Sequence, residues 1–389
     1  MRQTPALRDT GAHQAFEEIR GVITAPAEGV LDRAAYCALG VRQSIFPPQQ
    51  RDTIYDLFEK YRAWLGSAGL FDLNLTAHVW QGRAAPRYDF VVIDEVQDLT
   101  PVQLALVLRT QKKAGQFLLC GDSNQIVHPN FFSWAQVKQL FWNEPALAER
   151  QELRVLASNF RNGREAARVA NQLLKIKQQR FGSIDRESNY LVRAVGAEAG
   201  AVHLLADQDA ALKDLDRQIR QSTQVAVLVM HDEDKAEARK VFSTPLLFSI
   251  HEAKGLEYEN IVLYRFVSDH RVEFSVLTEG VKKDHLAADE LDYRRAKDKN
   301  DKSLEVYKFF VNALYVALTR AIRNLYIVES DTGHALFGLL DLVVVGAVKV
   351  EAQAATQEAW QKEARKLELQ GKQEQADAIR SGKIGRAHV

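Results

Sequence analysis

The chain has 389 residues, of which 46% are hydrophobic and 26% charged, and 51 basic side chains balance 51 acidic ones. This composition excludes a disordered chain and a strongly basic coat for nucleic acid, and the length leaves room for at least two domains with separate cores. The two cysteines, Cys37 and Cys120, lie far apart, which argues against a disulfide framework and a four-cysteine zinc site and favours a reducing compartment.

Neither a membrane span nor a secretory signal is visible in the sequence. The longest apolar stretch, 335–348, is interrupted by Asp341 and is shorter than the ~20 residues that a span requires. We therefore predict a soluble, cytoplasmic protein without a membrane partner. Residues 384–389 read like a translated sequencing adapter, so we treat them as a scar and expect the natural chain to continue past Lys383.

Residues 1–87 are predicted to be mostly helical. Pro47 and Pro48 suit a helix start, because the first turn leaves its amide hydrogens without intrahelical partners anyway. The apolar residues that follow recur at helical spacing: Ile54, Leu57, Phe58, Tyr61 and Leu65.

From Tyr88 the pattern becomes that of a parallel sheet. Two uninterrupted apolar runs, 90–93 and 116–120, flank a helical segment at 101–113. Strand, helix and strand with continuous apolar strands predict a parallel sheet covered on both faces. We assign residues 88–150 to a first α/β domain.

A second α/β domain is predicted for residues 151–350. In the segment 265–308, ten basic and ten acidic residues alternate in sign, which favours a solvated and partly mobile insertion. The expected strands are 225–230, 246–250, 260–266 and 324–328, and the expected helices lie near 162–177, 207–221 and 303–318.

Residues 351–383 are predicted to form a helical hairpin. Apolar residues recur at helical spacing from Trp360 to Leu367 and again from Ala376 to Ile379, with Gly371 between them for the turn. The pattern resembles the opening of a tetratricopeptide-like hairpin that could bind protein partners, although one unit does not establish a repeat.

Two adjacent carboxylates, Asp94 and Glu95, directly follow the first apolar strand. The carboxyl end of a parallel strand is where α/β folds bind ligands. One carboxylate there can hold magnesium while the next orients and deprotonates a water molecule. The alternative is that acidic residues merely cap the exposed end of a buried strand.

The second apolar strand ends in a Gly-Asp turn that carries Gln125. This amide can sense a terminal phosphate, and the alternative is an ordinary turn with a solvent-facing glutamine. Phe131, Phe132 and Trp134 come next, and aromatic faces there can stack on the bases of a single strand. A hydrophobic staple onto the following helix is the competing interpretation, which we prefer for Phe131, while both remain open for Trp134.

Arg161 and Arg320 carry forked donors that are always charged and suit a transferring phosphoryl group. A surface salt bridge is the alternative for each arginine. Between them, the run 251–257 follows a predicted strand and begins with His251, for which a structural role is the commoner outcome. The glycine in this run, Gly255, is equally compatible with an ordinary loop.

Taken together, these segments resemble the motifs of superfamily 1 helicases of the UvrD/Rep type, over about Tyr88 to Glu329. Motifs II to VI of that family read DExQD, GDxxQ, Asn-aromatic-Arg, HxxKGLE and VALTRA, and this chain carries DEVQD, GDSNQ, NFRN, HEAKGLE and YVALTRA. The amino-acid sequence of residues 125–134 more closely resembles that of a divergent branch of the family, in which this motor is joined to helical repeats.

The resemblance implies an α/β fold with two RecA-like parallel-sheet domains, the first incomplete, and helical N-terminal and C-terminal segments. It also implies ATP and Mg²⁺ as cofactors and hydrolysis in the cleft between the two domains. The roles that it implies are Mg²⁺ binding for Asp94, water activation for Glu95, γ-phosphate contact for Gln125 and Arg161, ribose and phosphate contact for Gly255 and Glu257, transition-state charge for Arg320, and nucleic-acid contact for Trp134, Phe132 and His251.

The implied activity is that of a fragment of an ATP-dependent DNA helicase or translocase. It would move along single-stranded DNA, with RNA less favoured, and the DExQD form suits the 3′ to 5′ branch. The short distance from Arg161 to His251, about ninety residues, predicts that the regulatory insertion of processive relatives is absent or vestigial.

The phosphate-binding loop of the family, Gly-x-x-x-x-Gly-Lys-Ser/Thr, does not occur in this sequence. In the family it lies upstream of motif II and precedes a helical insertion that residues 1–87 resemble. We therefore expect a first domain that lacks its first strand, this loop and a covering helix, with an exposed sheet edge. The chain alone should hydrolyse ATP negligibly, and robust turnover by the isolated polypeptide would contradict this. The alternative function is a helicase-like scaffold that binds protein partners or nucleic acid without hydrolysing ATP.

Overall fold

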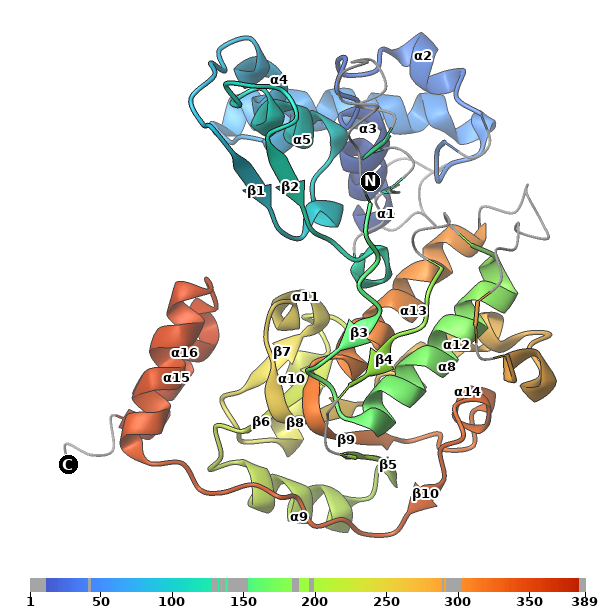
Figure 1. The fold of residues 1–389 in the computed structure, drawn as a ribbon, viewed down its shortest axis with the longest axis vertical. Coiled ribbons are helices and arrows are strands. Elements are labelled where there is room, and N and C mark those ends of the chain that lie inside the picture. Colours follow the sequence, from blue (N-terminus) through green and yellow to red (C-terminus); the bar gives the residue numbers. More distant parts are fainter. Residues whose placement is uncertain are drawn as a thin grey trace. The chain divides into compact units, whose positions relative to one another are not determined.

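The computed structural model contains two compact units (Figure 1). Unit 1 comprises Met1–Val155, Phe181–Asn189 and Asp292–Phe309, and unit 2 comprises Leu156–Arg180, Tyr190–Leu291 and Phe310–Val389. The residues that the structure describes are 12–40, 43–127, 132, 134, 137–138, 153–183, 189–195, 199–288, 290–291 and 303–384.

Helices dominate the first part of unit 1, as predicted. The longest is α3, which begins at Pro48 and ends before Gly69, whose φ of +65° stops the helix. Its buried face, which includes Ile54 and Phe58, packs with Ile23 and Tyr36 into one apolar cluster. The bounds are α1 Ala12–Glu18, the π-helical η2 Ile19–Ile23, α2 Arg33–Cys37, α3 Pro48–Ala68 and α4 Leu73–Gln81.

The sheet of unit 1 consists, within the described residues, of the parallel strands β1 (Val91–Ile93) and β2 (Phe117–Leu119), joined through α5 (Pro101–Leu108). Val91 and Ile93 are buried against Leu104 of α5. On the opposite face Val92 and Leu118 stand side by side in the register and are 63% and 51% exposed.

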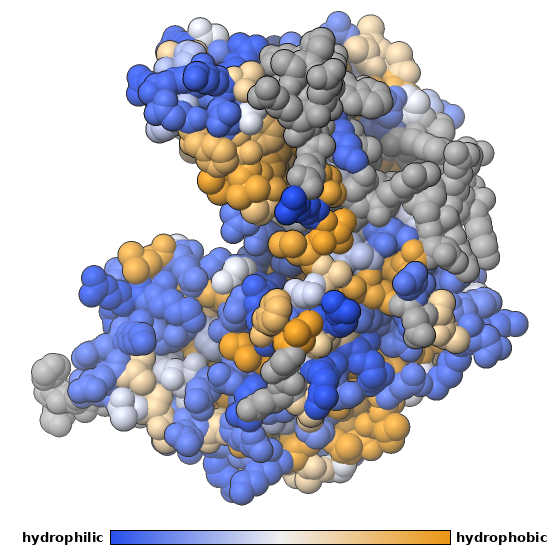
Figure 2. Space-filling view, in the orientation of Figure 1, coloured by the Kyte–Doolittle hydropathy of each residue, from blue (hydrophilic) through white to orange (hydrophobic). Residues whose placement is uncertain are grey.

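This opposite face is apolar and open to solvent. Tyr88 and Phe90, which precede β1 at alternate positions, are also exposed, and Figure 2 shows an orange patch over β1 and β2. The exposed sheet edge that the sequence predicts is a different feature, and it stays a prediction. The expectation that both faces are covered is wrong for the described residues, because α5 packs on one face alone.

Unit 2 contains a six-stranded, all-parallel sheet in the order β10-β5-β9-β8-β6-β7. The four predicted strands are β6, β7, β8 and β9, whereas β5 and β10 were not predicted. A short parallel pair, β3 and β4, lies outside this sheet. The bounds are β3 Ser158–Asn159, β4 Arg193–Ala194, β5 Ala201–Ala206, β6 Val225–Val229, β7 Leu247–Ser249, β8 Tyr258–Tyr264, β9 Ala321–Glu329 and β10 Val344–Val345.

Helices cover this sheet, which confirms the predicted α/β class with parallel sheets. Leu212 and Leu215 of α9 and Phe242 after α10 pack on the face that carries Val225 and Val227. Helices α8 and α13 are tied together by a hydrogen bond of 2.7 Å from Lys177 to Asn312. The bounds are α8 Arg164–Phe181, α9 Asp209–Ile219, α10 Lys235–Val241, α11 Ile250–Ala253, α13 Ser303–Leu318 and α14 Ala335–Leu339.

The segment after β8 differs from its prediction. Instead of a solvated insertion, residues 268–286 form η5 (Ser268–His270), α12 (Arg271–Thr278) and η6 (Lys283–Leu286). The physical reason is that Phe274, Leu277 and Leu286 are buried, so three apolar side chains anchor a segment that reads as mixed charge. Of the predicted insertion 265–308, residues 289 and 292–302 lie outside the described residues, and 303–308 belong to α13.

The predicted C-terminal hairpin is present as α15 (Gln357–Leu369) and α16 (Gln373–Ile379), followed by the π-helical η7 (Arg380–Ile384). Gly371 has a φ of +74° in the turn. The apolar residues that recur at helical spacing are buried, namely Trp360, Ala364, Leu367, Ala376 and Ile379. Among the helices that the structure describes, none has the length and apolar character to cross a membrane.

Candidate functional site

In unit 1 the candidate residues lie at the carboxyl ends of β1 and β2. Ile93 pairs with Leu119 in the parallel register, so both strands end at the same edge. Two backbone hydrogen bonds continue the pairing beyond the strands, from Cys120 to the Ile93 carbonyl (2.8 Å) and from Val96 to the Cys120 carbonyl (2.9 Å). The loops that carry motifs II and III are thereby held together.

Glu95 has a left-handed backbone with a φ of +53°, which is uncommon for a residue with a side chain. Its carboxylate accepts a hydrogen bond from the Gln97 amide, whose oxygen in turn accepts from the backbone N–H of Asp122 (3.1 Å). Gln97 is fully buried and therefore links the water-activating candidate of motif II to motif III. Strain of this kind gathers at functional sites.

Asp94 and Gln125 lie on either side of this link. Asp94 is exposed, and one of its carboxylate oxygens accepts from the Glu95 amide at 2.9 Å. Gln125 lies in the short helix η4 (Ser123–Gln125) and donates to the Asp122 carboxylate at 3.1 Å. An exposed aspartate beside a glutamate fits Mg²⁺, which takes one or two carboxylates and completes its shell with water and phosphate oxygens.

Phe132 and Trp134 pack edge to face, with ring centroids 5.4 Å apart. Both are partly buried against the cluster formed by β1 and α5. The two aromatics predicted to contact nucleic acid therefore sit at the border of a core, where a ring can be fixed by packing on one side. Phe131 lies outside the described residues.

In unit 2 motifs IV and V meet through a salt bridge. Arg161, just after β3, places its Nε 2.7 Å from Oε1 of Glu257, and both side chains are more than a third exposed. Exposed pairs of this kind contribute about 0–1 kcal/mol to stability, so this pair does little to hold the fold. It does place a fixed positive charge beside the residue expected to contact the ribose.

Asn162 joins motif IV to motif VI. It is 1% exposed, and its amide donates to the carbonyls of Thr319 (2.9 Å) and Ala321 (2.6 Å), which flank Arg320. Its position is fixed by Asn159, whose side chain donates to it at 2.7 Å. The loop between α13 and β9 is thus held by one buried amide.

Arg320 joins motif VI to motif V. The side chain is 3% exposed and donates to the carbonyls of Val316 (3.2 Å) and Leu256 (3.4 Å). The backbone closes the same junction, because Tyr258 donates to the Arg320 carbonyl at 3.2 Å. A permanently charged guanidinium is therefore held next to the loop that carries Gly255 and Glu257.

The remaining motif V residues lie around α11. Gly255 has a φ of +80°, and an added Cβ would meet nothing within 4 Å, so the backbone conformation and not crowding calls for glycine. His251 is partly buried on α11. Glu252 accepts hydrogen bonds from the amide and hydroxyl of Ser249, at 2.9 and 3.4 Å, and so caps this helix.

Three residues that organise the site were not singled out from the sequence: Gln97, Asn162 and Glu252. Each belongs to a motif that the sequence displays, but the chemistry was assigned to its neighbours. The available signal was the residue type, since an amide or carboxylate inside a motif at a strand end is suited to bridging backbone groups of the next loop. The structure brings together the predicted residues of motifs IV, V and VI in unit 2, and those of motifs II and III in unit 1.

Residues 52–140 match the sequence model of the UvrD/REP helicase N-terminal domain. The chain is a divergent helicase-like protein. The matched range contains motifs II and III, including Glu95, Gln97 and Gln125. Motifs IV to VI lie outside it and rest on the contacts described above.

Two curated relatives match parts of this chain. The human protein "TPR and ankyrin repeat-containing protein 1" is 23% identical over 339 residues, which cover 78% of this chain and 12% of that protein. The "F-box DNA helicase protein 1" of Schizosaccharomyces pombe (strain 972 / ATCC 24843) is 30% identical over 91 residues, which cover 23% of this chain and 10% of that protein. The matches span about a tenth of the length of each relative.

Two solved helicase structures are also similar to this chain. "The structure of PRRSV helicase" matches with a TM-score of 0.33 and 12% identity over 69% of this chain and 40% of that one. The arterivirus nonstructural protein 10 helicase, solved in complex with DNA, matches with a TM-score of 0.33 and 16% identity over 67% of this chain and 44% of that one.

Proposed function

We propose that this chain carries the motor of an ATP-dependent, UvrD-like DNA helicase or translocase, which couples ATP hydrolysis to movement along single-stranded DNA in the 3′ to 5′ direction. The observation that carries the proposal is the contact network of unit 2. There three separate motifs meet through the Arg161–Glu257 pair, the Asn162 amide and the buried Arg320 guanidinium.

The network supports phosphoryl transfer because it fixes two permanent positive charges. Arg320 is held by the carbonyls of Val316 and Leu256, which fix the position of its permanent positive charge. Arg161 is exposed enough to exchange its contact with Glu257 for a phosphate oxygen. Preorganised charges of this kind stabilise the charge that develops on a transferring phosphoryl group.

The residues of unit 1 supply the complementary chemistry. Asp94 would hold Mg²⁺, which on binding with ATP neutralises charge on the phosphate oxygens. Glu95 would accept a proton from the attacking water, and the Gln97 amide orients its carboxylate. Gln125 is fixed by Asp122 at the same edge, where it would report the presence of the terminal phosphate.

Nucleic-acid contact is assigned to Trp134, Phe132 and His251. The two aromatics are held against the core of unit 1, so a base can stack on them without ordering the rings first. The C-terminal helical segment with α15 and α16 would bind protein partners, and the name of the human relative describes repeats.

The test is the substitution Glu95→Gln in the protein expressed from its complete reading frame. We expect DNA-stimulated ATP hydrolysis to fall at least ~100-fold, because the amide cannot accept the proton, while ATP binding persists. Glu28→Gln is the matched control, since Glu28 is an exposed glutamate of the same unit.

An equal turnover of Glu95→Gln and wild type would contradict the proposal. The second candidate is a scaffold that binds partners without hydrolysing ATP, and what favours it is that Gly-x-x-x-x-Gly-Lys-Ser/Thr does not occur in these 389 residues. Full cellular function of the Glu95→Gln protein would favour this scaffold over the motor.

A further inference from the structure

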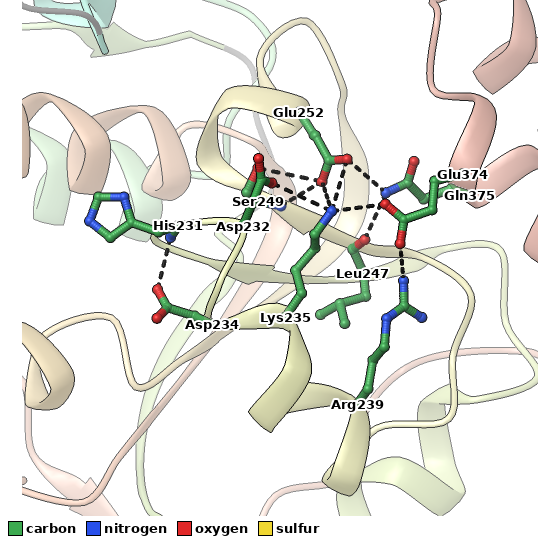
Figure 3. Close-up of polar contacts among 10 residues, drawn as sticks. All are labelled: His231, Asp232, Asp234, Lys235, Arg239, Leu247, Ser249, Glu252, Glu374 and Gln375. Carbon is green, nitrogen blue, oxygen red and sulfur yellow. Dashed lines mark hydrogen bonds and ion pairs between the residues drawn. The ribbon is translucent and has the colours of Figure 1, made fainter. Parts of the chain in front are cut away.

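The C-terminal hairpin and the motif V segment both belong to unit 2, and side chains of the hairpin contact this segment. The contact begins with Lys235 of α10, whose side chain is 12% exposed. Its ammonium group lies 3.1 Å from both oxygens of Glu252 on α11 and 2.9 Å from an oxygen of Glu374 on α16 (Figure 3). One lysine thus bridges the loop and the hairpin.

A second contact is made by Gln375, which is fully buried. Its amide donates to the Leu247 carbonyl at 3.1 Å and to the Glu252 carboxylate at 3.2 Å (Figure 3). Leu247 opens β7, and Glu252 caps the helix that follows it, so Gln375 holds the entrance of motif V.

The exit of motif V is held by α15. Tyr258, directly after Glu257, is 4% exposed and donates its hydroxyl to Glu363 at 2.7 Å. Lys366 lies over the Tyr258 ring, 4.8 Å from its centroid. The hairpin therefore contacts the segment 249–258 at two places, Glu252 and Tyr258. This segment contains His251, Gly255 and Glu257.

The charges of this contact reinforce one another. Burial opposes the charge of Lys235, but hydrogen bonds to Glu374 and Glu252 outweigh it and raise the pKa of Lys235. The same hydrogen bond from Lys235 lowers the pKa of Glu374, and Arg239 contributes from 2.5 Å. Of these groups Lys235 is the most buried, and a buried charge that loses one of its partners is costly.

We propose that the hairpin α15–α16 is a clamp that positions segment 249–258, with Lys235, Glu374 and Gln375 as its positioning residues, and so sets the affinity of this loop for single-stranded nucleic acid. The affinity part rests on the proposed function. The geometric part stands on the contacts alone. Partners that bind the hairpin would act on the loop through the same residues.

The test compares the full 389-residue chain with the variants Glu374→Ala and Glu374→Ala/Gln375→Ala. Amide hydrogen exchange in residues 249–258 should accelerate at least tenfold in the double variant and less in the single one. Glu374 is half exposed, so the single variant keeps the fold even where loss of Gln375 does not. Glu374→Asp, which retains a carboxylate, should restore slow exchange.

The matched control is Glu368→Ala, which removes the ion pair between Glu368 of α15 and Arg380 of η7 and leaves the contact of the hairpin with α10 and α11 intact. A labelled oligothymidylate is the nucleic-acid probe, and its dissociation constant should rise at least fivefold in the double variant. The Glu374→Asp chain should bind it like wild type. Unchanged exchange in 249–258 would overturn the clamp. Faster exchange with unchanged oligonucleotide affinity would overturn its role in nucleic-acid affinity.

The two proposals fail differently. Suppose that the wild-type chain does not bind the oligonucleotide while hydrogen exchange in 249–258 still responds to the variants. The proposed function and the affinity part of the clamp proposal are then contradicted, and the geometric part is supported. If wild type binds and the variants exchange and bind like wild type, the clamp is contradicted while the proposed function stands.

Discussion

Glu95 occupies a backbone conformation that costs of order 1–3 kcal/mol and persists only where its surroundings enforce it. Here they do so through the hydrogen bond from Val96 to the Cys120 carbonyl on one side and the Gln97 amide on the other. The carboxylate is consequently aimed by two neighbouring residues of its own motif. The loop after β2 matters as much as the loop after β1, because it supplies the opposing backbone groups.

A substitution at Gly121 tests this arrangement, because a side chain there would add a carbon atom beside Gln97. A Cβ at this position would collide with the Gln97 oxygen and lie 2.9 Å from a methyl group of Val96. We expect Gly121→Ala to destabilise unit 1 by ~1–3 kcal/mol, as overpacking does, and to break the Gln97 link. Urea-induced unfolding gives the first quantity.

Gly66→Ala is the matched control for this change. Gly66 lies within α3, and an added Cβ there meets nothing within 4 Å. This variant should gain up to ~1 kcal/mol, because alanine favours a helix over glycine. Equal effects of the two substitutions would show that the space beside Gln97 is not restricted.

At the scale of elements, the sheet of β1 and β2 has one buried face and one open face, and adjacent residues of one strand sample both. Val91 is 8% exposed, and Val92 is 63% exposed. We expect Val91→Thr to cost ~1–3 kcal/mol, because it buries a hydroxyl among apolar side chains. Val92→Thr should change the free energy of unfolding by less than ~0.5 kcal/mol.

The measurement is equilibrium unfolding of this 389-residue chain with each variant. The two substitutions are chemically identical, so the difference reports the environment alone. A large cost for Val92→Thr would mean that the apolar face is covered in solution and would contradict the open face seen here.

For the whole molecule, buried acids predict how stability depends on pH. Burial raises the pKa of Glu329 to about 7, although the Ser268 hydroxyl and the Val267 and Ser268 amides act against the shift. Burial likewise raises the pKa of Glu17 in unit 1 to about 7. Between the unfolded value near 4.5 and pH 7 the folded chain binds more protons, so this stabilisation is present in acid and is lost as pH rises.

We expect Glu329 alone to make the chain less stable at pH 8 than at pH 5, by on the order of 3 kcal/mol at most. Desolvation lowers the pKa values of the partly buried His203 and the buried His334, which act in the opposite direction, so the comparison is between wild type and Glu329→Gln. Chemical denaturation at both pH values should show a smaller loss in the variant. An identical loss in both would contradict the role of Glu329.

The sequence predicts regular elements well where apolar residues repeat strictly. The strands β6 to β9, the helices α3, α8, α9 and α13 and the C-terminal hairpin were all predicted from such repeats. The prediction failed for α12, where Phe274 and Leu277 anchor a segment whose average composition is polar. It also failed for β5, where His203 interrupts an apolar run. Averages over a window hide single anchoring residues.

The candidate site was predicted as separate motifs but not as a network. Nothing in the spacing of Asn162 and Arg320 indicates that one amide binds the carbonyls on both sides of that arginine. Such links depend on which loops the sheet order brings together, and that order was not predicted. The link from Gln375 to Glu252 joins residues 123 positions apart and is likewise set by packing.

The position of β9 in the sheet has a consequence for how the protein is made. It lies between β5 and β8, yet it is synthesised more than a hundred residues after β5. A ribosome-bound chain can pair β6 with β7 and β8 early, whereas β5 has no partner in the sheet until β9 and then β10 emerge. Unit 2 therefore completes its core late in translation. Until then the nascent chain carries an unpaired apolar strand, which is prone to aggregation and is the kind of segment that chaperones bind.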